Sequence, residues 1–217
     1  MLQKIREPGS AITHFIGAVL SALAAAPLIL RASQTSVLNT VAMSVFIISM
    51  FLLYSASTTY HSITLSKSVI KVFRKVDHMM IFILIAGSYT PVCLIALKGT
   101  LGTAMFCAVW GIAAAGILFK AFWITCPKWV SSVLYIGMGW TCVFAFVPLY
   151  NILPTAAFWW LLAGGILYTA GGVIYALKLP IFNNLHKNFG SHEIFHLFVL
   201  AGSFCHFIFM YSYVSKM

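Results

Sequence analysis

The chain has 217 residues, of which 62% are hydrophobic and only 7% are charged. A soluble globular domain has about a quarter of its residues charged, so this composition excludes that class and indicates a polytopic membrane protein. The net charge of +10 does not indicate nucleic-acid binding, because the basic residues follow a membrane topology instead.

Apolar runs recur from Ala11 to Val214, each close to the ~20 residues that an α-helix needs to cross a bilayer. Short polar connections such as "RASQTS", "LKGT", "TCPK" and "YNILP" separate them. The sequence therefore predicts an all-α fold in which residues 1–217 form a single membrane domain. Its seven predicted spans cover about residues 11–30, 40–61, 76–97, 102–122, 130–149, 155–177 and 190–213.

The first span has two readings, because a basic start and the small residues Ala24–Ala26 also fit a cleaved signal peptide. The apolar run continues past these alanines to Leu30, and His14 interrupts its beginning. We therefore keep it as the first membrane helix.

The basic residues indicate an orientation. Placed on the seven spans, ten lie on the side of the N-terminus: Lys4, Arg6, Lys67, Lys71, Arg74, Lys75, Lys120, Lys128, Lys178 and Lys187. Three lie on the other side: Arg31, Lys98 and Lys216. Cytoplasmic loops of membrane proteins carry the excess of lysine and arginine, so we predict a cytoplasmic N-terminus and an extracytoplasmic C-terminus.

Two features of the middle spans concern packing. The five cysteines are scattered without a C-x-x-C pair, which predicts neither a disulfide framework nor a thiolate zinc site. The sixth span contains Ala163–Gly165 and Ala170–Gly172, where small residues seven apart allow a neighbouring helix to approach closely.

The ionisable residues of the spans gather at one depth. Glu7 precedes the first span, Asp77 opens the third and Glu193 lies in the first turn of the seventh; the chain has no other acidic residue. His206 stands apart in the outer half of the last span, and His186 falls in the last predicted loop. The remaining histidines share the depth of the acids: His14, His61, His78, His192 and His196.

Spacing within this layer indicates a metal site. His192 and His196 are four residues apart, so both rings leave one face of a helix, and Ser57 and His61 have the same spacing. Three imidazoles from two helices and a carboxylate from a third form the donor set that Zn²⁺ favours. We predict zinc at His61, His192 and His196, with Asp77 bound directly or through a water.

Less specific readings remain open for each part. Two histidines four apart also bridge helix interfaces by hydrogen bonds, and Asp77 beside Arg74 and Lys75 also fits a solvated helix start. Ionisable groups within a membrane usually face one another and mark function, so their common depth on four helices favours the metal. The residues predicted to support the site rather than bind the metal are Ser57, His78 and Glu193.

Four stretches in this order, "REPGSAITHFIG", "YSASTTYHS", "KVDHMMIFILIAGSYTP" and "HEIFHLFVLAGSFCHF", carry a family resemblance. The chain resembles the bacterial hemolysin III family, within the larger progestin and adipoQ receptor family. The resemblance extends over all seven spans. It implies a zinc ion near the cytoplasmic face held by three histidines, with an aspartate close by; the matching positions are Ser57, His61, Asp77, His192 and His196.

One segment departs from the family pattern. The first helix of the family usually has an asparagine between the glutamate and the histidine, whereas this chain has Glu7, Ser10 and His14. A serine cannot bridge two groups as an amide does, so the roles of these three residues stay open.

The leading functional hypothesis is a zinc-binding protein of the plasma membrane that acts in membrane-lipid homeostasis, with membrane lipids as partners. The family name associates it with cytolysis, but no amphipathic pore-forming segment supports a lytic role. A zinc-dependent, ceramidase-like lipid amide or ester hydrolase is the alternative, with Asp77 as general base and Ser57 supporting the oxyanion.

Two further hypotheses are a proton or cation transporter and a purely structural zinc. The outer half of the spans offers only His206 to an ion path, and no inverted repeat is evident, which argues against transport. A structural zinc would hold the second, third and seventh spans together.

Overall fold

A computed structural model describes residues 5–177 and 190–217. In these ranges seven helical segments are long and apolar enough to cross a membrane, which confirms the predicted all-α class. Lys4, Lys178, His186 and Lys187 lie outside the described residues. The segments are Pro8–Ser33, Val37–Ser62, Lys67–Leu97, Gly99–Phe122, Lys128–Ile152, Thr155–Leu177 and Ser191–Lys216.

Three of these segments are compound. Four spans consist of one helix each: α1 (Pro8–Ser33), α2 (Val37–Ser62), α4 (Gly99–Phe122) and α7 (Thr155–Leu177). The seventh span begins with α9 (Ser191–Ser212). A short 3₁₀ turn, η3 (Val214–Lys216), follows α9. The third span joins α3 (Lys67–Pro91) to the π-helical turn η1 (Val92–Leu97). The fifth joins α5 (Lys128–Gly139), the 3₁₀ turn η2 (Trp140–Ala145) and α6 (Phe146–Ile152).

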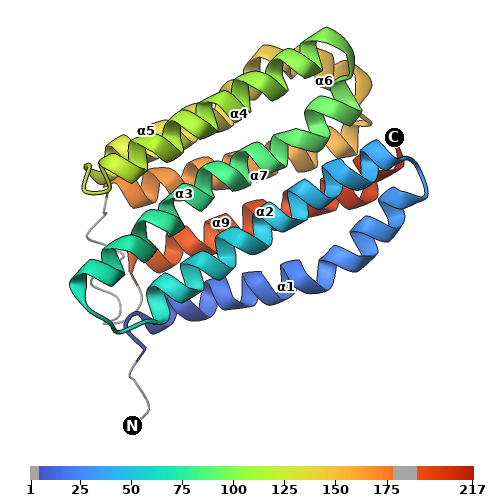
Figure 1. Cartoon of the computed structure of the whole chain (residues 1–217). Helices are drawn as coiled ribbons and strands as arrows, with labels where there is room; N and C mark the ends of the chain where they lie inside the picture. The colour runs from blue at the N-terminus through green and yellow to red at the C-terminus, as the bar shows by residue number, and fades with distance from the viewer. Residues whose placement is uncertain (1–4, 178–189) are drawn as a thin grey trace.

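The helices run along one another in a bundle (Figure 1). Consecutive helices α1 to α4 pack side by side, and α9 packs against both α7 and α1. Helices α1 and α9 are therefore neighbours in space, although they lie near opposite ends of the sequence. Helix α1 begins at the end of the bundle where α2 meets α3, and the C-terminus lies at the opposite end (Figure 1).

Helix α3 begins well before the predicted start of the third span. Its first turns carry four basic residues, which make this part of the helix polar, so hydropathy marks only the apolar part that follows. The added turns bring Asp77 into a continuous helix, preceded by Arg74 and Lys75.

Irregular turns interrupt two spans that were predicted as single helices. Pro91 lacks the N–H that a regular helix requires, and the π-helical turn η1 follows directly. The fifth span changes to 3₁₀ geometry at Trp140. Val92, Trp140 and Cys142 line the internal cavity described below, so both interruptions shape its wall.

The predicted close approach of the small residues in the sixth span is confirmed. A Cβ atom on Gly171 would lie 2.8 Å from Cβ of Phe198, and one on Gly164 would lie 2.2 Å from Cδ2 of His206. Glycine at these positions lets α7 pack tightly on α9. The five cysteines are free, as expected.

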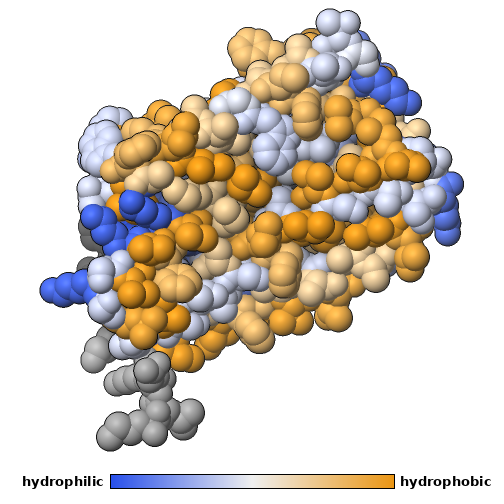
Figure 2. Space-filling model, in the orientation of Figure 1, coloured by the Kyte–Doolittle hydropathy of each residue, from blue (hydrophilic) through white to orange (hydrophobic). Residues whose placement is uncertain are grey.

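The surface agrees with a membrane location. Apolar side chains cover the length of the bundle, and hydrophilic residues gather towards its two ends (Figure 2). Large hydrophobic side chains such as Phe122 and Val37 are 88% and 81% exposed. Contiguous apolar surface of this kind marks contact with lipid rather than with water.

Candidate metal centre

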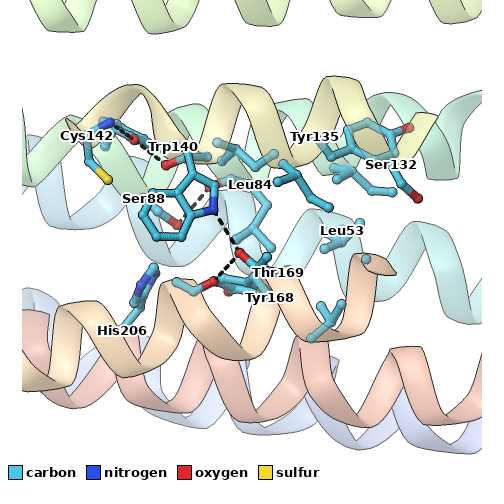
Figure 3. Close-up of a pocket in the computed structure, with 18 of the residues that line it drawn as sticks. Leu53, Leu84, Ser88, Ser132, Tyr135, Trp140, Cys142, Tyr168, Thr169 and His206 are labelled. Carbon is cyan, nitrogen blue, oxygen red and sulfur yellow. Dashed lines mark hydrogen bonds between the residues drawn. The ribbon is translucent and has the colours of Figure 1, made fainter. Parts of the chain in front are cut away.

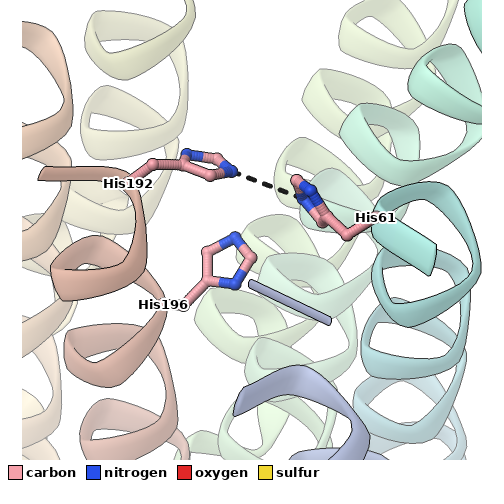
Figure 4. A group of neighbouring side chains, drawn as sticks. All are labelled: His61, His192 and His196. Atoms are coloured by element: carbon pink, nitrogen blue, oxygen red, sulfur yellow. Dashed lines mark hydrogen bonds between the residues drawn. The ribbon is translucent and has the colours of Figure 1, made fainter. Parts of the chain in front are cut away.

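Three histidines converge at the end of the bundle where the chain begins. His61 lies in the last turn of α2, and His192 and His196 lie in the first turns of α9. One ring nitrogen of each lies within 4.8 Å of the others. The rings point towards a common space between α2 and α9 (Figure 4), with Nε2 of His61 and Nε2 of His192 3.3 Å apart.

Glu193 fixes the start of the helix that carries two of these histidines. Its Oε2 atom accepts a hydrogen bond from the N–H of Gly190, the residue before α9, at 2.8 Å. Its Oε1 atom accepts one from the hydroxyl of Ser10 on α1 at 2.6 Å. Glu193 thus satisfies a free backbone donor of the helix end and joins α9 to α1.

Glu7 orients the ring of His61. The carboxylate, 43% exposed just before α1, pairs with Nδ1 of His61, and the N–H of Glu7 donates to the His61 carbonyl at 3.0 Å. The hydrogen bond between the carboxylate and the His61 ring, together with the nearby Arg6 guanidinium, lowers the pKa of Glu7 below its usual value. A carboxylate on one ring nitrogen holds the other, Nε2, free as a metal ligand.

Helix α1 orients His196 in the same way. The Nδ1 atom lies 3.3 Å from both the Ser10 carbonyl oxygen and the Thr13 hydroxyl. The Thr13 hydroxyl already donates to backbone carbonyls, so both groups accept a hydrogen bond from Nδ1–H, which leaves Nε2 as the free lone pair. The ring of His14 stacks on the other side, with ring centroids 3.6 Å apart and an interplanar angle of 8°.

The first turns of α1 are therefore part of the site. The sequence placed Glu7, Ser10 and His14 at the right depth but left their roles open, and it gave no role to Thr13. Their common depth with the three histidines was the available signal; the contacts themselves depend on how α1 packs against α2 and α9.

Asp77 and Ser57 lie in the same cavity as His192 and His196. Both residues are buried, with 8% and 1% of their surfaces exposed. The hydroxyl oxygen of Ser57 is buried and has no hydrogen-bond partner among the described residues. Among the described residues, the group of converging ligand atoms contains the three histidines without Asp77.

The cavity extends from this polar end far into the bundle. Figure 3 shows the part of its lining between Ser132 and His206. Its volume is about 190 Å³, and its walls are mostly apolar. Asp77 and His196 line one part of it, and Leu149 and Phe158, from the opposite end of the bundle, line another. A narrow apolar space of this shape suits a hydrocarbon chain.

The donor set fits zinc. Three neutral imidazoles with an adjacent carboxylate are typical zinc ligands, and three protein ligands leave a position open. On His61 and His196 the other ring nitrogen has a hydrogen-bond partner, as is usual for metal-binding histidines. His61 and His196 are buried, and Nε2 of His61 lies 3.3 Å from Nε2 of His192, so two ring nitrogens face each other at the place where a metal ion would bind.

Within the described residues, seven apolar helical segments and a histidine triad at one end of their bundle define a multi-pass membrane protein with a buried candidate metal site. The model of the family described as "Haemolysin-III related" matches residues 2–207. The chain belongs to the haemolysin III family.

Similar proteins agree with this assignment. The chain is 43% identical to hemolysin-3 of Bacillus cereus over 99% of its own length and 94% of that protein. It is 41% identical to the hemolysin-3 homolog of Bacillus subtilis (strain 168), over 97% and 95%. A more distant relative, the monocyte to macrophage differentiation factor of Homo sapiens, is 26% identical over 76% and 66%.

Proposed function

We propose that the protein is a zinc-binding protein of the plasma membrane that acts on membrane lipids by hydrolysing an amide or ester bond next to an acyl chain. One observation supports this proposal above all. Asp77 and Ser57 line the same apolar cavity as two of the three histidines. A catalytic set at the end of a hydrocarbon-sized space matches a substrate with a polar carbonyl group and a long apolar tail.

His61, His192 and His196 would hold the zinc ion through their converging nitrogens. When bound, zinc supplies Lewis acidity at the substrate carbonyl and makes a neighbouring water more acidic. Asp77 accepts the proton of the attacking water as general base and returns it to the leaving nitrogen or oxygen when the amide or ester bond breaks. Ser57 donates a hydrogen bond to the oxyanion that develops on the carbonyl. The apolar walls exclude bulk water and align the acyl chain, so that the carbonyl reaches these groups.

The first experiment is elemental mass spectrometry of the detergent-purified protein beside the His192→Ala/His196→Ala variant. We expect about one zinc per wild-type chain, as in a single three-histidine site, and none in the double variant. Absence of metal from both proteins would mean that the histidines form a hydrogen-bonded network, and the zinc-dependent function would be rejected.

The second experiment tests hydrolysis. Zinc-loaded protein is incubated with ceramide, an N-acyl amide or a phospholipid, and the released fatty acid is measured. We expect Asp77→Asn to lower turnover by roughly 10²–10⁴-fold, the usual contribution of a general base, while zinc content stays at the wild-type level. His61→Ala is the matched control that removes a ligand.

A zinc-loaded wild type without activity on any of the three substrates would refute the hydrolase. Zinc would then have a structural role between α2 and α9. Melting of the bundle on chelation would support that role.

A further inference from the structure

The cavity reaches a histidine that the proposed reaction does not use. His206 lies about 15 Å beyond His196 along α9, at the rise of an α-helix. Both side chains line the same cavity. In Figure 3 His206 lies near Trp140, at the end of the view away from Ser132.

The His206 ring is held in a defined orientation. Its Nε2 atom lies 3.3 Å from the carbonyl oxygen of Leu161 on α7. The absence of a side chain at Gly164 makes room for the ring, and Tyr168 packs against it edge-on at 5.3 Å. A carbonyl oxygen only accepts hydrogen bonds, so Nε2 carries the proton and Nδ1 of the neutral ring presents a lone pair.

That lone pair is unused. Nδ1 of His206 is buried and has no hydrogen-bond partner within residues 5–177 and 190–217. Ser88 lines the same cavity, and its hydroxyl gives its proton to the Leu84 carbonyl at 2.8 Å, so its oxygen also retains a lone pair. Buried polar atoms of this kind usually have a partner.

The other polar groups nearby already have partners. Thr169 donates to the Gly165 carbonyl and accepts from the Trp140 indole. The hydroxyl of Tyr168 pairs with Ser203 at 2.7 Å. His206 and Ser88 therefore both offer an acceptor at this end of the cavity, which a carboxylate or phosphate cannot satisfy and a hydroxyl can.

We propose that this end of the cavity is a second polar subsite, where His206 accepts a hydrogen bond from a hydroxyl group on the distal part of a bound acyl chain. The preferred ligand is then a hydroxylated acyl chain, either as a free acid or within a lipid. The proposal rests on the proposed function only in placing the carbonyl end of the chain at the histidine triad.

The test is a binding measurement on the zinc-loaded, full-length protein in detergent. Radiolabelled octadecanoic acid is displaced by a series of octadecanoic acids that carry one hydroxyl group at successive positions. We expect the affinity to peak at one distal position, about tenfold above the unsubstituted acid, as one buried hydrogen bond predicts. A flat series, or no binding of any member, would overturn the proposal.

Two variants assign the preference to the subsite. His206→Phe has a ring of similar size without an acceptor, and we expect it to bind the preferred hydroxy acid no better than octadecanoic acid itself. Ser88→Ala, which removes only a hydroxyl, should reduce the preference and decides the question if His206→Phe does not fold. Phe204→Leu changes a side chain that is 59% exposed on the outside of α9. This variant is the matched control and should keep the preference for the hydroxy acid.

An unchanged preference in both variants would place hydroxyl recognition elsewhere and refute the subsite. A water molecule bound to His206 in place of a ligand hydroxyl would give the flat series. The hydrolase fails separately: a positional preference without turnover would refute the proposed reaction alone, and turnover with a flat series would refute the subsite alone.

Discussion

Glu7 lies at the edge of the membrane segment, yet it contacts a histidine of another helix. Its carboxylate pairs with Nδ1 of His61, and it forms an ion pair with Arg6, whose Nε atom lies 3.4 Å from Oε1 of Glu7. A carboxylate in this position fixes the tautomer and the orientation of the ring. We predict that Glu7→Gln weakens zinc binding by about 10–100-fold, the usual effect of losing such a partner.

Competition with a chromogenic chelator measures this affinity. Glu193→Gln is the control, because Glu193 bonds to Ser10 and Gly190 rather than to a ring nitrogen of the triad. Glu193→Gln should lower the stability of the protein but reduce its zinc affinity less than Glu7→Gln does. An equal loss of zinc affinity in the two variants would contradict a specific role for Glu7.

At the scale of single residues, the sequence predicted the three histidines but only some of the residues that contact them. The four-residue spacing of His192 and His196 is a local property, and the depth of His61 follows from the span boundaries. The contact between Thr13 and His196 depends on the approach of α1 to α9, which no local pattern encodes. The direct or water-mediated role of Asp77 stays a prediction.

At the scale of the helices, the spacing between α2 and α3 depends on Gly87. A Cβ atom there would lie 2.1 Å from Oγ of Ser49, 2.6 Å from its Cβ and 3.3 Å from the Val45 carbonyl oxygen. We predict that Gly87→Ala forces the helices apart and destabilises the protein by about 1–3 kcal/mol, the range for overpacking. Thermal unfolding in detergent measures the change.

Gly111→Ala is the matched control on α4. No atom lies within 4 Å of a Cβ placed on this exposed glycine. The variant therefore creates no clash, and its higher helix propensity should stabilise the protein by at most about 1 kcal/mol. If both variants lower the melting temperature equally, packing at Gly87 does not determine the helix separation.

The helices were predictable in number and approximate position, because each needs an apolar run long enough to cross the bilayer. Their irregular parts were not. Hydropathy does not distinguish the π-helical turn at Val92–Leu97 or the 3₁₀ turn at Trp140–Ala145 from an α-helix. Both turns line the cavity, so hydropathy could not predict the shape of the cavity.

For the whole molecule, the distribution of basic residues predicts the direction of insertion. Arg6, Lys67, Lys71, Arg74 and Lys75 lie at the end of the bundle where the chain begins, and the C-terminus lies at the other end (Figure 1). We predict that this basic end, with the histidine triad, faces the cytoplasm.

Fusions to alkaline phosphatase, which is active only outside the cytoplasm, check the orientation. A fusion after Met217 should be active, and one placed between Ser62 and Lys67 should be inactive. The reverse pattern would put the histidine triad on the extracytoplasmic side and would contradict the positive-inside prediction.

The pairing of the first and last helices has a consequence for biosynthesis. Ser10 and Glu193, which bond to each other, are 183 residues apart in the chain, and so are Thr13 and His196. During translation α1 and α2 enter the membrane with His61 and Glu7 but without the two histidines of α9. The site therefore assembles only after the last helix has inserted, and loading of the proposed zinc ion would be a late event in maturation and a marker of completed chains.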